Sequence, residues 1–266
     1  MSKTLLLVLL AAVPLSAQAD TLIAARPAIE DPVPPVVDKR PEVAALLEKL
    51  KGHTDKKGSE DRDAISVMDQ LLPQFKTSGP KDKAAIVATI AKCFELRRDE
   101  KEGVPNNQLF LGCAVALGEM GPESTKALLA GVDSKNLKKQ TAVRHRLILS
   151  LGKTHDVKEA LDPLIAMLQD KDATLIGAAA EALGEFSGAD LETRKKAFEA
   201  MLKVVMSAKG AKDSNAQDTI ARDRYDVLNA PIIGSLGKLS KHDERDPDKW
   251  QNWWNKNKLK NWDDTK

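Results

Sequence analysis

The dipeptide leucine-glycine recurs four times in this chain, and each copy ends a stretch with helical apolar spacing. The copies are Leu117-Gly118, Leu151-Gly152, Leu183-Gly184 and Leu236-Gly237, with successive glycines 34, 32 and 53 residues apart. A unit that repeats every ~20 to 50 residues is typical of a solenoid, in which each unit buries its apolar face against its neighbours. The repeat therefore predicts a stack of helix pairs.

Each leucine-glycine pair belongs to a longer apolar stripe. The residues five and nine positions before the glycine are apolar, and steps of four residues return to the same face of an α-helix. The residue two positions before the glycine is always small: Ala116, Ser150, Ala182 and Ser235. Because small side chains let a second helix come close, we interpret the pattern as a packing motif rather than a ligand-binding loop.

A partner of similar length precedes each of these four helices, and one further pair comes before them, which predicts five pairs. The pairs are 41–51 with 60–76, 80–97 with 105–120, 122–131 with 137–153, 156–169 with 172–186, and 190–206 with 219–240. Proline is tolerated in the first turn of a helix and marks several of the starts, at Pro41, Pro80, Pro105, Pro122 and Pro247. The polar segment 207–218 is expected to form a mobile surface loop.

The first forty residues are expected to lie outside the stack. Lys3 leads into the apolar run 5–13, and Ala17-Gln18-Ala19 follows, which predicts a signal peptide over residues 1–19 that is cleaved after Ala19. Residues 20–40 are rich in proline and predict an extended linker. The solenoid is then assigned to residues 41–240, and a capping helix and tail to residues 241–266.

The charge of the chain is nearly balanced, with 41 Lys and Arg against 39 Asp and Glu and a formal net charge of +2. Acids and bases are interspersed, whereas a nucleic-acid binder concentrates basic residues on one face. We therefore expect no nucleic-acid partner. No segment after the signal peptide is apolar enough to span a bilayer, so the mature chain is expected in the periplasm or outside the cell.

One stretch carries a resemblance to a known family. Residues 156–188, DVKEALDPLIAMLQDKDATLIGAAAEALGEFSG, resemble a bacterial HEAT-like repeat, with Pro163 in the first helix, Asp170 and Asp172 in the turn, and the motif Ala182-Leu183-Gly184 at the end. The resemblance extends over residues 41–240. It implies a right-handed superhelix whose second helices line a concave face that binds proteins, and it implies no reaction.

The family usually places an arginine eight residues before that glycine, where it pairs with aspartates of neighbouring turns. Only Arg144 meets this expectation, because Phe110, Ile176 and Asn229 occupy the other three positions. We therefore expect the repeats to be held together chiefly by apolar contacts.

Four residues of the second helices are candidate partner contacts: Arg144, His145, Arg146 and Glu181. The first three belong to the most basic stretch of the chain, which begins at Lys135. Cations at the start of a helix can bind an anionic group. The simpler interpretation is a solvated turn together with an inter-repeat ion pair at Arg144.

All four tryptophans lie near the C-terminus. Trp250, Trp253 and Trp254 share one helical face, and Trp262 follows. A terminal aromatic helix would cap the last repeat; the alternative is a platform for sugar rings or for a partner's groove. The W-x-x-W-W run also resembles the ending of secreted HEAT-like bacterial proteins, and that ending implies no activity.

The two cysteines, Cys93 and Cys113, are expected on partner helices at a similar height, as either a disulfide or two buried free thiols. They lack the Cys-x-x-Cys spacing of redox catalysts and zinc sites. We therefore expect neither a cofactor nor a resident metal.

The histidines argue against the enzymes of this fold. HEAT-like deoxyhypusine hydroxylase binds two irons through His-Glu dyads, and no His-Glu pair occurs in this sequence. A metal site built from His145, His155 and Asp156 by tertiary proximity is the remaining alternative.

The sequence thus predicts a non-enzymatic, envelope-located scaffold or adaptor that binds a protein or peptide along its second helices. Two alternatives stay open: a glycan or peptidoglycan binder that uses the tryptophans, and a HEAT-like lyase or hydroxylase.

Overall fold

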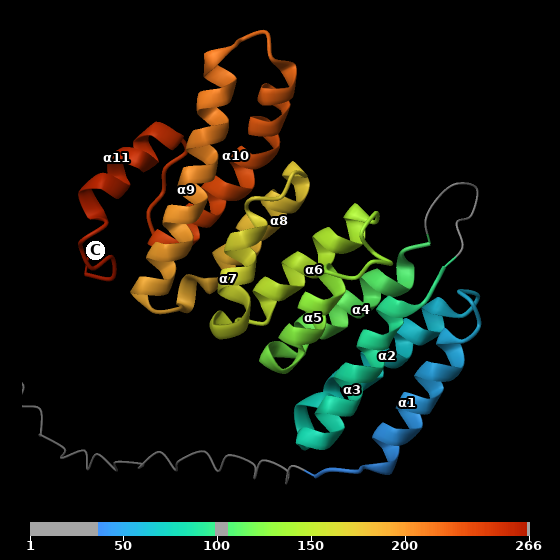
Figure 1. Ribbon diagram of the computed structural model, residues 1–266. Coiled ribbons are helices and arrows are strands. Elements are labelled where there is room, and N and C mark those ends of the chain that lie inside the picture. The colour runs from blue at the N-terminus through green and yellow to red at the C-terminus, as the bar shows by residue number, and fades with distance from the viewer. Residues whose placement is uncertain (1–36, 99–105, 265–266) are drawn as a thin grey trace, which may run out of the picture. The chain divides into compact units, whose positions relative to one another are not determined.

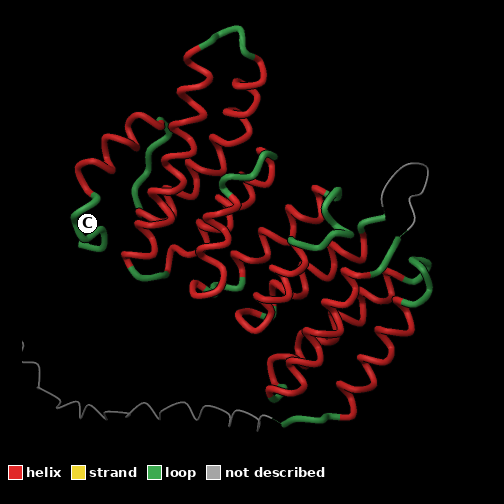
Figure 2. The backbone as a smooth tube through the Cα atoms, in the orientation of Figure 1, coloured by secondary structure: helices red, strands yellow, loops and turns green. Residues whose placement is uncertain are grey.

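The computed structural model describes residues 37–98 and 106–264, and the regular elements of this part of the chain are helices. Figure 2 shows helices joined by loops. The one extended pairing among the described residues is an isolated bridge between Val37 and Ser78. The prediction of an all-α solenoid is confirmed.

Eleven α-helices and three short 3-10 helices (η1–η3) follow one another along the described residues. They are α1 (Pro41–Thr54), α2 (Asp61–Thr77), α3 (Pro80–Lys92), η1 (Cys93–Glu95), α4 (Gln108–Glu119), η2 (Gly121–Ser124), α5 (Thr125–Val132), α6 (Thr141–Lys153), α7 (Val157–Met167), α8 (Ala173–Gly184), η3 (Glu185–Gly188), α9 (Leu191–Ser214), α10 (Thr219–Ser240) and α11 (Pro247–Asn257).

The helices form two layers. The first helices of the pairs (α1, α3, α5, α7 and α9) contact one another in order, and so do the second helices (α2, α4, α6, α8 and α10). The five predicted pairs are therefore present. Pro41, Pro80 and Pro247 lie in the first turns of α1, α3 and α11, and Pro122 lies in η2. Pro105 lies outside the described residues.

The second helices approach one another at the glycines of the leucine-glycine pairs. Each glycine faces the small residue that stands two positions before the glycine of the next repeat, and a Cβ atom added there would collide with it. An added Cβ would lie 3.0 Å from Ser150 Cβ at Gly118, 2.6 Å from Ala182 Cα at Gly152, and 2.7 Å from Ser235 Oγ at Gly184.

This close approach distinguishes the two layers. The second helices contact their neighbours over much more of their length than the first helices do. A stack that is spaced more closely on one side bends toward that side, so the second helices form the inner side of the stack.

The segment 207–218 differs from the expectation of a surface loop. α9 continues through Ser214 and α10 begins at Thr219, so only residues 215–218 connect them. Ala208 is buried, and Lys209 pairs with Asp213 at 2.6 Å across one helical turn. These contacts offset the low helix propensity of Gly210. The two helices consequently project beyond α7 and α8 (Figure 1).

The last four residues of the predicted linker 20–40 differ from an extended tether, because residues 37–40 pack on the first two repeats. Asp38 accepts the backbone N–H of Asp82 at 3.1 Å, and Asp82 in turn accepts the N–H groups of Lys39 and Arg40 at 2.9 and 3.0 Å. Gly79 makes room, since a Cβ there would lie 2.3 Å from Asp38 Oδ1. Residues 1–36, with the predicted signal peptide and most of the linker, lie outside the described residues.

The C-terminal end of the stack is closed by an aromatic cluster. Phe198 of α9 is fully buried, and its ring lies among all four tryptophans. The centroid distances are 5.6 Å to Trp250, 5.5 Å to Trp253, 5.2 Å to Trp254 and 5.3 Å to Trp262. The cluster covers the apolar face that the last pair would otherwise expose, as the capping interpretation expects.

The contact between second helices can be tested at Gly152. The substitution Gly152→Ala adds a Cβ only 2.6 Å from the Ala182 backbone and should lower the free energy of unfolding by about 1–3 kcal/mol. The matched control is Gly210→Ala, because Gly210 is helical with nothing within 4 Å of an added Cβ. The control should be neutral or stabilising by up to ~1 kcal/mol. Denaturant unfolding followed by circular dichroism measures both; equal stability of Gly152→Ala and the parent protein would contradict the contact.

Candidate functional site

A hollow of about 530 Å³ lies on the inner side of the stack, between α6, α8 and α10. We call it the inner groove. Its apolar lining includes Leu149 of α6, Ala182 of α8, and Ala230 and Pro231 of α10, and Gly234 lies beside them. The small residues that let the helices approach therefore also leave this surface open and shallow.

Helical spacing places charged side chains along the same surface. Arg146, Leu149 and Lys153 lie at i, i+3 and i+7 on α6, so they share one face. Glu181 and Glu185 are four residues apart at the end of the α8 segment. All of these side chains line the inner groove, together with Lys238 of α10.

The rim of the inner groove carries both signs of charge. Lys153 pairs with Glu119 at 3.2 Å, and Lys238 pairs with Glu185 at 2.8 Å. These pairs join neighbouring second helices and are largely exposed, so each contributes little to stability and can exchange partners. Arg146 and Glu181 make no ion pair with another described residue and are free to meet charges on a ligand.

The structure thus brings two of the predicted contact residues, Arg146 and Glu181, to one surface. Arg144 has a different role. It is half-buried and pairs with Asp170 at 3.3 Å, in the turn of the next repeat. Asp170 also accepts the backbone N–H of Asp172 at 2.9 Å, so Arg144 fixes this turn as the family resemblance implies. His145 is half-buried and lies outside the inner groove.

The predicted contacts at Trp250 and Trp254 do not lie on the surface, because both side chains are buried in the aromatic cluster. Trp253 is half-buried, and the His242 ring stacks on it at 5.3 Å with an interplanar angle of 12°. The indole N–H of Trp250 donates to the Glu244 carbonyl at 3.1 Å. Stable packing of the last repeat therefore occupies the rings that a sugar-binding platform would need to expose.

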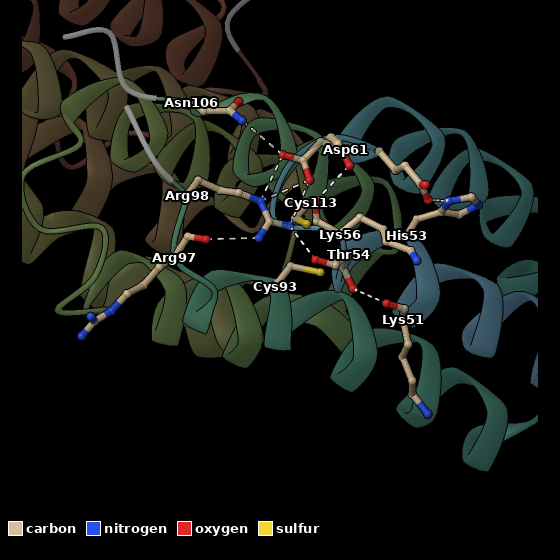
Figure 3. A network of polar contacts seen from close by, with 12 residues as sticks. Lys51, His53, Thr54, Lys56, Asp61, Cys93, Arg97, Arg98, Asn106 and Cys113 are labelled. Carbon is tan, nitrogen blue, oxygen red and sulfur yellow. Dashed lines mark hydrogen bonds and ion pairs between the residues drawn. The ribbon is translucent and has the colours of Figure 1, made fainter. Parts of the chain in front are cut away.

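A buried ion pair between the first two repeats was not anticipated from the sequence. Arg98 donates to Asp61 through Nε at 3.1 Å and Nη2 at 2.9 Å, and Nη2 also donates to the Thr54 carbonyl at 3.0 Å (Figure 3). Gly58 permits this, since its φ is +99° and a Cβ there would lie 3.0 Å from Asn106 Nδ2. Arg98 lies outside the arginine position of the family, so repeat alignment alone could not find it.

A second such residue is Arg194 of α9, which is buried. It donates to the Leu239 carbonyl at 3.1 Å and to Asp263 in the C-terminal tail. Lys241 also donates to Asp263 at 2.8 Å. Hydrogen bonds from Lys241 and Arg194 lower the pKa of Asp263, although burial opposes them. Arginine contacts thus add to the apolar packing of the stack, at positions other than those of Phe110, Ile176 and Asn229.

The alternative metal site is not assembled. His145 lies in the second turn of α6 and His155 follows its last turn, so ten residues, or about 15 Å of helix, separate them. Within residues 37–98 and 106–264, no group of three or more His, Cys, Asp or Glu side chains is placed to bind a metal ion.

Cys93 and Cys113 are free thiols, and both are buried. They lie on η1 and α4, next to the Arg98–Asp61 pair (Figure 3). The expectation that they meet on partner elements agrees with this placement, and bridging between them remains a prediction.

Comparison with protein families matches residues 134–204 to HEAT repeats. Searches of curated proteins and of solved structures give no match. HEAT repeats are commonly scaffolds for protein interaction and typically non-enzymatic. Among the described helices, none is both long and apolar enough to cross a membrane.

Arg144 and Arg146 lie on the same helix, but we expect only Arg144 to contribute to the stability of the fold. Arg144→Ala should lower the free energy of unfolding by about 1–3 kcal/mol, because it leaves Asp170 without its charged partner. Arg146→Glu and Glu181→Lys should change it by less than ~0.5 kcal/mol, since both side chains are exposed. Denaturant unfolding of the three variants is the measurement. If Arg146→Glu lowered the free energy of unfolding as much as Arg144→Ala, Arg146 would be a structural residue.

Proposed function

We propose that this chain, which is a HEAT-repeat protein, is a scaffold or adaptor that binds a polypeptide partner in the inner groove. The observation that carries the proposal is the open apolar surface between α6, α8 and α10, where Arg146 and Glu181 form no ion pair with any residue that the structure describes. The two residues offer a partner one charge of each sign.

The chemistry of the inner groove suits a segment of protein better than a small molecule or a nucleic acid. Protein interfaces combine an apolar centre with a polar, solvent-accessible rim. A nucleic acid would require a surface with one sign of charge, whereas Glu181 and Glu185 lie among the basic residues of this rim. The partner we infer therefore presents apolar side chains flanked by an acidic and a basic residue.

A binding role also fits the exposure of these charges. Active sites usually shift the pKa of a catalytic group by burying it beside specific charges. Arg146, Glu181 and Lys238 instead extend into solvent around a shallow surface. This arrangement supports recognition by complementary contacts rather than acid-base catalysis.

We further propose that the protein acts in the cell envelope or outside the cell. The proposal rests on the N-terminal sequence, in which Lys3, the apolar run 5–13 and Ala17-Gln18-Ala19 follow the order of a secretory signal.

Binding in the inner groove can be tested by site-specific photo-crosslinking. A photoreactive residue at position 230, where Ala230 of α10 is exposed and lines the inner groove, should give an adduct with a protein partner in producing cells. The control is position 158 in α7, where Lys158 is exposed on the other layer. Mass spectrometry of the adduct identifies the partner segment.

The charge of Arg146 gives the second arm of this experiment. Adding Arg146→Glu to the position 230 protein should reduce the adduct several-fold, because the substitution reverses a rim charge. Equal adducts from positions 230 and 158, or an adduct unaffected by Arg146→Glu, would exclude the inner groove as the binding surface.

The location can be tested on the processed chain. Export and cleavage after Ala19 should give a protein that begins at Asp20 and fractionates outside the cytoplasm. Intact-mass measurement and N-terminal peptide analysis of each cell fraction determine this. Recovery of chains that retain Lys3 in the cytoplasm alone would overturn the proposed location.

A further inference from the structure

The two cysteines are the only ones in the sequence, and the fold brings them together. Cys93 lies in η1, directly after α3, and Cys113 lies midway along α4, which packs against η1. The two thiols lie close enough to influence each other's pKa, and both are withdrawn from solvent. Two thiols twenty residues apart in the chain thus end close together inside the second repeat.

The pair differs from the surroundings of a metal site. Cys113 Sγ donates to the thioether sulfur of Met68 at 3.9 Å. Cys93 Sγ donates to the Thr89 carbonyl at 3.8 Å. A closed zinc site needs four ligands such as thiolates or imidazoles. Two neighbouring thiols without two further ligands of this kind among the described residues are suited instead to a bond between them.

The electrostatics make the two thiols unequal. The neighbouring Cys113 thiol lowers the pKa of Cys93, and the Arg98 guanidinium acts in the same direction, whereas burial opposes them. Burial raises the pKa of Cys113 well above its ordinary value. Cys93 is therefore the thiol that ionises first, and the thiolate is the form that attacks a disulfide.

We propose that Cys93 and Cys113 form an intramolecular disulfide in the mature protein. The Cys93 thiolate attacks an external disulfide, either a small molecule or a protein oxidant, and releases one of its sulfurs as a thiol. The Cys113 sulfur, after losing its proton, then displaces the second sulfur. In total the two cysteines lose two electrons and two protons, and the oxidant becomes two thiols.

The bond would close the segment between the two helices of the second repeat, and this segment contacts the first repeat. Between Cys93 and Cys113 lie Arg98 and Asn106, both of which donate to Asp61 of α2. The disulfide holds both ends of this segment, so it keeps Arg98 at the buried carboxylate. It thereby stabilises the junction between repeats through loop closure.

The test uses the full mature chain, purified in reduced form, and does not depend on its location or on partner binding. Refolding with oxidised and reduced glutathione should yield a monomer about 2 Da lighter, with no thiol titratable after denaturation. Its midpoint of thermal unfolding should exceed that of the dithiothreitol-treated protein by about 6–12 °C.

The double variant Cys93→Ser/Cys113→Ser is the control, and its unfolding midpoint should not respond to dithiothreitol. The single variant Cys113→Ser should instead retain a mixed disulfide with glutathione at Cys93. Two titratable thiols after refolding, glutathione adducts on both cysteines of the parent protein, or an oxidised form no more stable than the reduced one would each overturn the proposal.

Discussion

The structure depends on the contact between a glycine and a small residue of the next second helix. At Gly118, Gly152 and Gly184 the neighbouring helix lies so close that no side chain fits between them. This proximity aligns the buried leucines of successive repeats in one core and draws the inner side of the stack together. The inner groove is a consequence of the same packing, because small residues next to exposed ones leave a shallow surface.

Arginines connect neighbouring repeats, and they connect the last repeat to the C-terminal tail. Arg98 binds Asp61, Arg144 binds Asp170, and Arg194 binds Asp263. Each guanidinium connects elements that are distant in the sequence, so it fixes the position of one element relative to the next. Arg98 and Asp61 are both buried, so replacing only one of them would leave an uncompensated buried charge and destabilise the fold.

The sequence predicted the architecture well because local periodicity specifies it. The leucine-glycine spacing and the small residues at Ala182 and Ser235 were sufficient to predict the pairs and their close approach. The continuation of α9 through Ser214 was missed, since its stability comes from packing against α10 rather than from propensity.

The candidate site was only partly predictable. Arg146 and Glu181 were identified from helical phase, whereas the participation of Lys153 and Lys238 depends on how three helices are placed side by side. Trp250 and Trp254 were assigned to two competing roles because their spacing describes one face without saying what covers it. Burial around Phe198, a residue of another helix, assigns both to the core.

The aromatic cluster has a consequence for assembly between molecules. A solenoid whose last helix pair presents an open apolar face can accept the first pair of another copy, and head-to-tail contacts of this kind grow into filaments. Trp250, Trp254 and Trp262 instead pack on Phe198, so the chain covers this part of its last helix pair with its own side chains. Another copy could stack on Phe198 only after displacing α11 and the residues that follow it.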